Sequence, residues 1–145
     1  MDPLTHLLIT RKAISSDSKV VLAGLAADAP FYLTYPIWLI QQGQIAIAFR
    51  KNEWPEAPKW MHTAHNIFHS LPVLLAVTVA IRLVRGRWSR EALAWGLHIA
   101  VDIPTHSRQQ WAPQFLWPLS DITVDGVSWT EAILSIVKWL LKRLE

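Results

Sequence analysis

A histidine and an aspartate lie four residues apart inside a segment that is otherwise apolar. Residues 92–103 contain only two groups that ionise, His98 and Asp102. On a helix these positions share one face. An ionised carboxylate among apolar neighbours is costly unless a partner compensates its charge. A divalent metal ion is such a partner, because imidazole nitrogen and carboxylate oxygen together suit zinc and its neighbours.

A second group of histidines precedes another apolar run. His62, His65 and His69 fall at i, i+3 and i+7, which places them on one helical stripe. His65 and His69 repeat the spacing with which two side chains of one helix hold a single ion. If the two helices pack antiparallel, four ligands converge on one centre, as in the carboxylate–histidine sites of bundle cores. Three further candidate ligands lie elsewhere in the chain: His6, Asp28 and His106.

Each of these residues also has an ordinary structural interpretation. A single histidine on an apolar helix is more often a hydrogen-bonded core residue than a ligand. Asp28 precedes Pro30 and is equally typical of an N-cap or a turn. Asp102 precedes Pro104 and has the same alternative, although His98 one turn earlier argues against it. The two pairs taken together favour metal binding over a metal-free cluster.

The composition limits the kind of site and the kind of protein. The chain has 145 residues and no cysteine, so a metal must be held by His, Asp, Glu or backbone oxygen. Charged residues make up 17%, against about a quarter in an average protein, and the mean hydropathy is +0.22. The nine tryptophans favour places with one apolar and one wet side. We therefore expect one domain over residues 1–145 that is embedded in or associated with a membrane.

The basic residues gather in one place. The formal net charge is +3, and four arginines fall close together, at Arg82, Arg85, Arg87 and Arg90. This cluster is too local for a nucleic-acid surface, and no recognition helix or basic stripe interleaved with aromatic residues accompanies it. We expect no nucleic-acid partner. A basic cluster beside an apolar run fits a solvated helix end or a membrane contact.

Apolar periodicity, caps and prolines predict an all-α fold, a compact bundle of four to six helices. Asp2, Ser89 and Thr130 are the expected N-caps. A short hairpin near 124–126 is the one expected β element, in a Pro- and Trp-rich loop over 109–129. The expected helices cover 4–14, two parts of 20–49 separated at Pro30, 60–84, a segment from 90 that ends by Pro104, and 130–144.

Four segments combine these features in a particular order. They are Asp2-Pro-Leu-Thr-His6, His65-Asn-Ile-Phe-His69-Ser70-Leu71, His98-Ile-Ala-Val-Asp102 and Leu116-Trp-Pro-Leu-Ser120. In this combination, the chain resembles the bacterial membrane-bound metal-dependent hydrolases of the YdjM type, a family regarded as related to zinc-dependent phospholipase C and P1 nuclease. The resemblance extends from residue 2 to about residue 120.

The resemblance implies a ligand set that begins near the N-terminus. His6 matches the histidine of the family's D-x-x-x-H segment, and Asp28 matches the first aspartate of its P-D-x-D segment. The chain departs from the family at two places. Pro30 or Phe31 stands where the second aspartate is expected, and Asn66 replaces the arginine that commonly follows the first histidine of the next segment.

The other ligands implied by the resemblance lie in the two pairs. His65 and His69 match the histidines of the H-R-x-x-T-H-S segment. His98 and Asp102 match the H-x-x-x-D segment, and His106 lies near where the family continues toward its Pro-rich loop. His62 or His106 is the candidate to compensate for the missing aspartate.

The resemblance also implies an activity and a place in the cell. It predicts a metal-dependent hydrolase of the bacterial inner membrane that acts on a phosphoester or lipid-like substrate through metal-activated water. Zinc is the first expectation for the ion, with manganese or iron as alternatives. Asp28 or Asp102 is the expected catalytic base, and Arg108 is a candidate to hold a substrate phosphate.

Two other kinds of protein fit the same residues. One is a small membrane metal-binding or transport protein without hydrolytic activity, in which His and Asp line a polar path. The other is a structural protein whose His–Asp pairs are hydrogen-bonded and free of metal. A closed cluster open to one side favours hydrolysis, whereas a ladder of polar groups across the apolar thickness favours transport.

Overall fold

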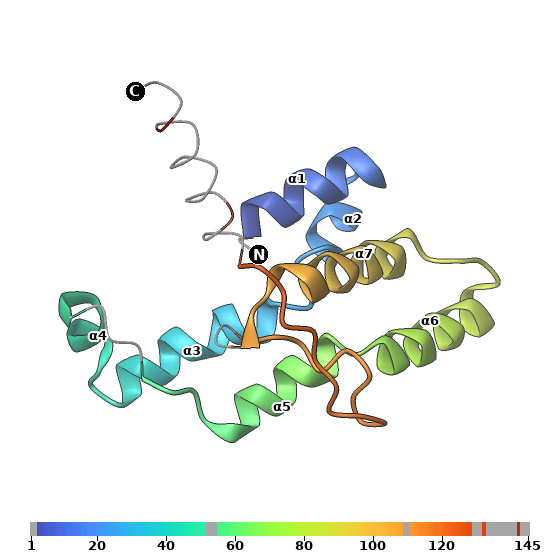
Figure 1. Cartoon of the computed structure of the whole chain (residues 1–145). Helices are drawn as coiled ribbons and strands as arrows, with labels where there is room; N and C mark the ends of the chain where they lie inside the picture. The colour runs from blue at the N-terminus through green and yellow to red at the C-terminus, as the bar shows by residue number, and fades with distance from the viewer. Residues whose placement is uncertain (1–2, 52–54, 109–110, 129–131, 133–141, 143–145) are drawn as a thin grey trace.

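The structure, a computed structural model, describes residues 3–51, 55–108, 111–128, 132 and 142. Within these residues the chain forms seven helices and no strand, which confirms the all-α prediction and exceeds the expected four to six helices (Figure 1). The helices are α1 (Pro3–Ala13), α2 (Ser18–Ala23), α3 (Ala29–Gln41), α4 (Ile45–Lys51), α5 (Lys59–Phe68), α6 (Leu71–Arg85) and α7 (Arg90–Thr105).

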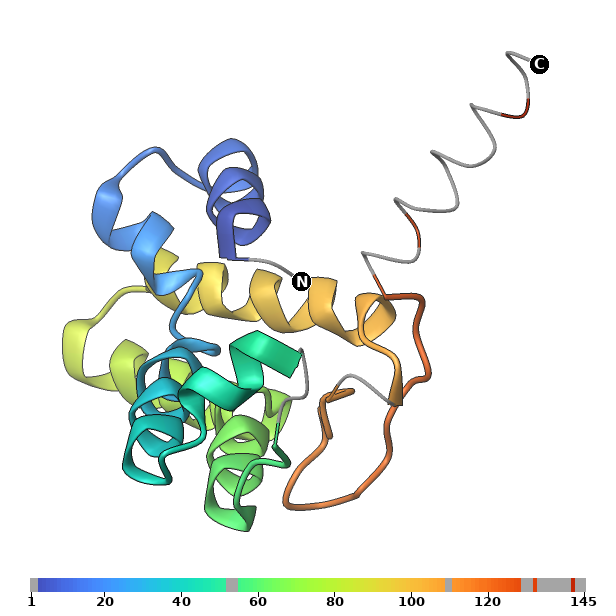
Figure 2. The same ribbon diagram turned by 90° about the vertical axis from the view of Figure 1, so that its left-hand side faces the viewer.

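Helix α7 lies in the middle of the arrangement. It contacts α1 and α2 on one side and α6 on the other, while α3 packs against α4 and α5. Figures 1 and 2 show α1 and α2 on one side of α7, with α5 and α6 on the other. Helix α7 therefore lies between helices from the N-terminal part and from the middle of the chain.

A small apolar core joins α3 to α5. It is formed by Tyr35, Leu39, Ala57 and Met61, each no more than 8% exposed. Tyr35 carries the polar group of this core, and its hydroxyl donates a 2.5 Å hydrogen bond to the carbonyl of Pro55. The core fixes α5 against α3, and with it the histidines of α5.

A break separates α5 from α6, where the sequence predicted one helix over 60–84. The two helices are bent by 54°. Pro72 stands in the first turn of α6, where its missing N–H costs nothing, whereas inside a continuous helix it would remove a hydrogen bond and its ring would clash with the preceding turn. Ser70 is the N-cap, and its hydroxyl accepts from the amide of Val73 at 3.1 Å. The prediction of one continuous helix was wrong because these local stop and start signals outweigh the apolar run.

The stretch over 20–49, expected in two parts separated at Pro30, forms three helices, α2, α3 and α4, with breaks at 24–28 and 42–44. The signals at the ends of α6 and α7 were more reliable. Ser89 caps α7 and accepts from the amide of Ala92 at 3.2 Å. Gly86 ends α6 in the left-handed region, with φ 69°. Helix α7 continues to Thr105, past the Pro104 at which it was expected to end. The predicted cap at Asp2 lies outside the described residues, as does the helix predicted for 130–144 apart from positions 132 and 142.

The expected hairpin near 124–126 is absent from the described segment 111–128. This part of the chain pairs with the end of α7 instead. The amide of Gly126 donates to the carbonyl of His106 at 2.9 Å, and the amide of Val127 to that of Pro104 at 3.1 Å. A Cβ at Gly126 would overlap the carbonyl of Pro104, so a glycine allows this close approach.

None of the described helices is by itself long and apolar enough to cross a bilayer, whereas the bent pair of α5 and α6 meets the criteria jointly by length and composition.

Candidate metal centre

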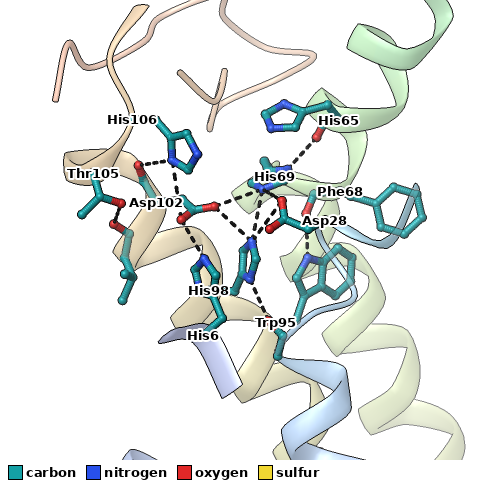
Figure 3. A network of polar contacts seen from close by, with 12 residues as sticks. His6, Asp28, His65, Phe68, His69, Trp95, His98, Asp102, Thr105 and His106 are labelled. Atoms are coloured by element: carbon teal, nitrogen blue, oxygen red, sulfur yellow. Dashed lines mark hydrogen bonds and ion pairs between the residues drawn. The ribbon is translucent and has the colours of Figure 1, made fainter. Parts of the chain in front are cut away.

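Five ionisable side chains from four parts of the fold meet in one buried cluster beside α7 (Figure 3). Each of the five is at most 9% exposed. α1 contributes one member, the turn before α3 another, the end of α5 a third and α7 the last two. The members of this central cluster are His6, Asp28, His69, His98 and Asp102.

Asp102 is the carboxylate that most imidazoles approach. Its Oδ1 lies 3.0 Å from His6 Nε2. Its Oδ2 lies 3.1 Å from His98 Nε2 and 3.4 Å from His69 Nε2. The i, i+4 pair of α7 thus meets α1 on one side and the end of α5 on the other.

Asp28 faces the same cluster and is not a helix cap. It occupies the N-cap position of α3, but its side chain makes no capping hydrogen bond. Its Oδ1 lies 3.4 Å from His69 Nε2 and 3.7 Å from His98 Nε2. Between the two interpretations of this residue, the geometry favours the ligand.

The sequence predicted that two antiparallel helices bring their ligand pairs together face to face, but the structure joins the ligands differently. His69 follows the last residue of α5, at the break before α6, with φ −102° and ψ 14°. The break turns this one histidine toward His98 and Asp102 of α7. The helix end, and not the helix face, supplies the ligand.

Backbone carbonyls orient the two central imidazoles. His98 Nδ1 lies 2.7 Å from the carbonyl of Gly24, and His69 Nδ1 lies 2.9 Å from the carbonyl of His65. A carbonyl only accepts, so each Nδ1 carries a proton and donates it. Both Nε2 atoms therefore point into the cluster, where they lie 3.3 Å apart. Metal-binding histidines are held in this way, with the outer nitrogen bound to a backbone oxygen.

The electrostatics of the cluster favour anionic carboxylates. Burial raises the pKa of Asp28, but hydrogen bonds from His69 and His98 outweigh it and hold the pKa well below the usual range. Burial likewise raises the pKa of Asp102, and hydrogen bonds from its imidazole neighbours, His6 first, bring it far below that range. Both groups are therefore ionised at neutral pH, as metal ligands must be.

The pKa values of the imidazoles are shifted in opposite directions. Burial lowers the pKa of His98, but the carboxylates of Asp102 and Asp28 outweigh it and raise the pKa to about 9. The pKa of His69 is raised in the same way against its burial. Burial and the neighbouring His69 lower the pKa of His65 to about 3. His65 therefore stays neutral, with a lone pair available for an ion.

The described residues include two buried groups that could hold a metal ion. One is His6, Asp28, His98 and Asp102, and the other is Asp28, His65 and His69, with the ligand atoms of each group within 4.8 Å of one another. The shared residue is Asp28. The histidines and aspartates of the separate sequence motifs thus lie side by side, and their donor atoms are imidazole nitrogens and carboxylate oxygens.

His106 lies at the edge of this arrangement. It is partly buried, and its Nδ1 lies 3.6 Å from Asp102 Oδ1 and 3.2 Å from the carbonyl of the same residue. Burial lowers its pKa. Of the residues implied as ligands, His106 is the one that neither metal-holding group contains.

A polar pocket of about 590 Å³ opens beside His65. Trp111 lines it and stacks on His62, with ring centroids 4.0 Å apart. Asn66, which replaces the family's arginine, also lines it and donates to Gln114 Oε1 at 2.9 Å. Arg108 completes one wall. The pocket therefore adjoins the second metal-holding group through His65.

Sequence reasoning missed two contributors to the site. The carbonyl of Gly24 orients His98, and the ring of Trp111 packs edge-on against His65, with centroids 5.5 Å apart. A backbone carbonyl leaves no sequence signal. The composition indicates only that tryptophans favour places with one apolar and one wet side, and the contacts of Trp111 with His62 and His65 place it at the pocket.

No family model, curated protein or solved structure matches this chain. The functional argument consequently rests on the residues and the geometry described above.

Proposed function

We propose that the protein is a metal-dependent hydrolase whose central cluster holds a divalent ion, zinc before manganese or iron. The observation that carries this proposal is the 3.3 Å separation between His69 Nε2 and His98 Nε2. The Nδ1 atom of each ring donates its proton to a backbone carbonyl. Three protonation states of the pair are then possible without a metal.

Two of these states place like groups against each other. If both rings are neutral, two nitrogen lone pairs face each other at 3.3 Å. If both are protonated, which their raised pKa values favour, two cations repel at that distance by about 5 kcal/mol at an effective dielectric constant of about 20, and the carboxylates of Asp28 and Asp102 must offset that repulsion. Only the singly protonated pair allows one Nε2 to donate to the other. In that state the histidine pair carries one positive charge, which balances only one of the two negative charges of Asp28 and Asp102.

A divalent ion removes both difficulties. It accepts the lone pairs of two neutral imidazoles and balances two carboxylates. The spacing also fits, because two donors that each lie about 2.0–2.1 Å from a tetrahedral ion are about 3.3 Å apart. The distances that link the donors of His69, His98, Asp28 and Asp102 run from 3.1 to 3.7 Å. This favours a metal centre over a metal-free hydrogen-bonded cluster.

Zinc suits the donor set best. Three or four ligands drawn from imidazole and carboxylate are typical of zinc sites, and the carboxylate content leaves manganese and iron as alternatives. The second group, Asp28, His65 and His69, adjoins the first and offers a position for a second ion. The absent second aspartate of the resembled family limits the oxygen ligands there.

Hydrolysis is the reaction that this arrangement supports. A zinc-type ion lowers the pKa of bound water to about 7 and polarises an ester oxygen. The low pKa values of Asp28 and Asp102 suit ligands, and they make both carboxylates weak bases. Arg108 lines the polar pocket beside His65, which supports the proposal that its guanidinium orients a substrate phosphate. The ligands gather at one centre beside this pocket and not along a polar path, which favours hydrolysis over transport.

The resemblance to membrane-bound hydrolases of the YdjM type supports the same reading. It leads us to propose a phosphoester or lipid-like substrate and a place at the bacterial inner membrane. The low charge content and nine tryptophans agree with a membrane location.

Elemental analysis tests the metal centre first. We expect zinc, manganese or iron in the purified protein and its loss from His69→Ala and Asp102→Ala. A wild-type protein without any of these metals would contradict the proposal, and unchanged content in both variants would contradict the assigned ligands. A phosphoesterase screen of the loaded protein then tests the reaction. Metal without hydrolysis of any phosphoester would favour the metal-binding alternative. In Arg108→Gln we expect a raised KM with little change in kcat.

A further inference from the structure

Helix α6 leaves apolar side chains exposed along its length. It has fifteen residues, none of them buried, and only Arg82 and Arg85 are charged. Its last turn presents Leu83 and Val84, which are 79% and 86% exposed. Apolar surface of this extent on a monomer marks a contact with a partner or a membrane.

An apolar groove runs between α6 and α7. It has a volume of about 600 Å³, and its walls include Leu74 and Leu75 from α6 and Leu93 from α7. Trp88 also lines the groove and is 69% exposed. The groove extends the exposed face of α6 toward the turn that joins the two helices.

The arginine cluster surrounds that turn. A second pocket, of about 400 Å³, is lined by Arg85, Arg87 and Arg90. The guanidinium of Arg82 lies over the ring of Trp88, 5.8 Å from its centroid. Two acids, Asp17 and Glu91, line the same pocket, so the arginines outnumber them there.

The cationic and apolar surfaces are continuous. Trp88, Ser89 and Arg90 line both the arginine pocket and the apolar groove. Exposed apolar residues, a tryptophan and several arginines in one place form the combination with which a helix lies in a bilayer interface.

We propose that the α6–α7 turn and the exposed face of α6 dock onto an anionic lipid bilayer. Leu83, Val84 and Trp88 enter the boundary between headgroups and acyl chains, while the arginine cluster binds lipid phosphates. This inference rests on the membrane association proposed above and does not depend on the hydrolytic activity. A second copy of the chain is the less favourable occupant, because a two-fold contact at this turn would place arginines against arginines.

Vesicle flotation tests this docking. The probes are vesicles of phosphatidylcholine alone and of phosphatidylcholine mixed with phosphatidylglycerol. We expect binding to the mixed vesicles, weaker binding to the neutral ones, and partial release at high salt because the lipid charge is screened. A basic residue near an anionic surface changes the partition coefficient about fivefold, so a triple replacement of Arg85, Arg87 and Arg90 by Gln should weaken binding about a hundredfold.

Two further variants separate the contributions. Leu83→Gln with Val84→Gln should weaken binding to both kinds of vesicle, because it removes the apolar part. Arg50→Gln with Lys59→Gln is the control, since it removes two exposed cations from α4 and the start of α5, which lie away from the α6–α7 turn in Figure 1. It should leave binding close to that of the wild type. Circular dichroism of each variant checks that the fold is retained.

Equal binding to neutral and anionic vesicles would overturn the proposed role of the arginines. Vesicle binding that neither α6–α7 variant reduces would overturn the assigned surface. A dimer that does not bind vesicles, and that Leu83→Gln with Val84→Gln dissociates, would replace the membrane by a second copy. Metal content is measured on the same samples. Vesicle binding without metal upholds this inference while the proposed metal centre fails, and the reverse result separates them equally well.

Discussion

Replacing Asp102 by asparagine removes a buried charge that four imidazoles approach. His6, His69 and His98 contact its oxygens at 3.0 to 3.4 Å, and His106 lies at 3.6 Å. Asparagine keeps the size and shape of the side chain, so the packing of α7 changes little. The variant therefore isolates the effect of the charge.

The magnitude follows from the burial of Asp102, which is fully inaccessible to solvent. Removing one partner of a buried charge pair costs about 3–5 kcal/mol. If the ion loses a contact of this size, its affinity falls by roughly two to four orders of magnitude. In the metal-free protein, the pKa of His98 should fall from about 9, because the nearer of its two carboxylates is gone.

The assay is a zinc titration of the chelator-treated protein against a competing chelator, followed by thermal unfolding with and without zinc. Zinc should raise the Tm of the wild type and have little effect on Asp102→Asn. Asp121→Asn is the matched control, since it makes the same chemical change at an exposed position. A zinc affinity in Asp102→Asn within about threefold of the wild-type value would refute the charge-balance reasoning.

Three further predictions follow from the same geometry. Because the pKa of His98 is raised to about 9, metal binding must displace its proton, so metal affinity should rise with pH up to about 9, by up to about tenfold per unit. Calorimetry in buffers of different ionisation enthalpy measures the released proton, and an affinity that is flat from about pH 7 to 9 would contradict this. The pKa of His65 is lowered from 6.5 to about 3, so its stability contribution is complete above pH 6.5 and is lost as the pH falls toward 3. His65→Gln, which does not titrate, should make the metal-free protein less sensitive to acid in unfolding experiments. Gly24→Ala should destabilise by about 1–3 kcal/mol, since its Cβ would overlap Thr10 Oγ1. In a Thr10→Ala background this loss should be smaller, and a purely additive double-mutant cycle would argue against the overlap.

Much of the local structure was predictable from short-range signals. Ser89 and Gly86 mark helix ends by side-chain capping and left-handed backbone, and the structure places them there. The break before α6 was predictable in principle from Ser70 and Pro72. It was missed because the apolar run over 71–81 dominated the interpretation of that segment. The hairpin prediction failed because Gly126 serves a close approach to α7 and not a reverse turn between strands.

In the candidate site, too, some features follow from local sequence and others depend on tertiary packing. The spacing of His98 and Asp102 places them on one helix face whatever the rest of the chain does. Whether Asp28 caps a helix or faces His69 depends on how the turn before α3 packs against the end of α5. The packing of α2 against α7 brings the carbonyl of Gly24 to His98 and so directs its Nε2 inward.

By itself, the sequence determined the helices, most of their ends and the pairs of ionisable residues that each helix presents, because these follow from interactions within a few residues. The tertiary structure decided which of those residues meet. His6 and Asp102 are 96 positions apart and lie 3.0 Å from one another, and the packing of α1 against α7 creates that proximity. A metal centre depends on ångström-scale distances between segments that are remote in the chain, so it becomes visible only when the helices are packed.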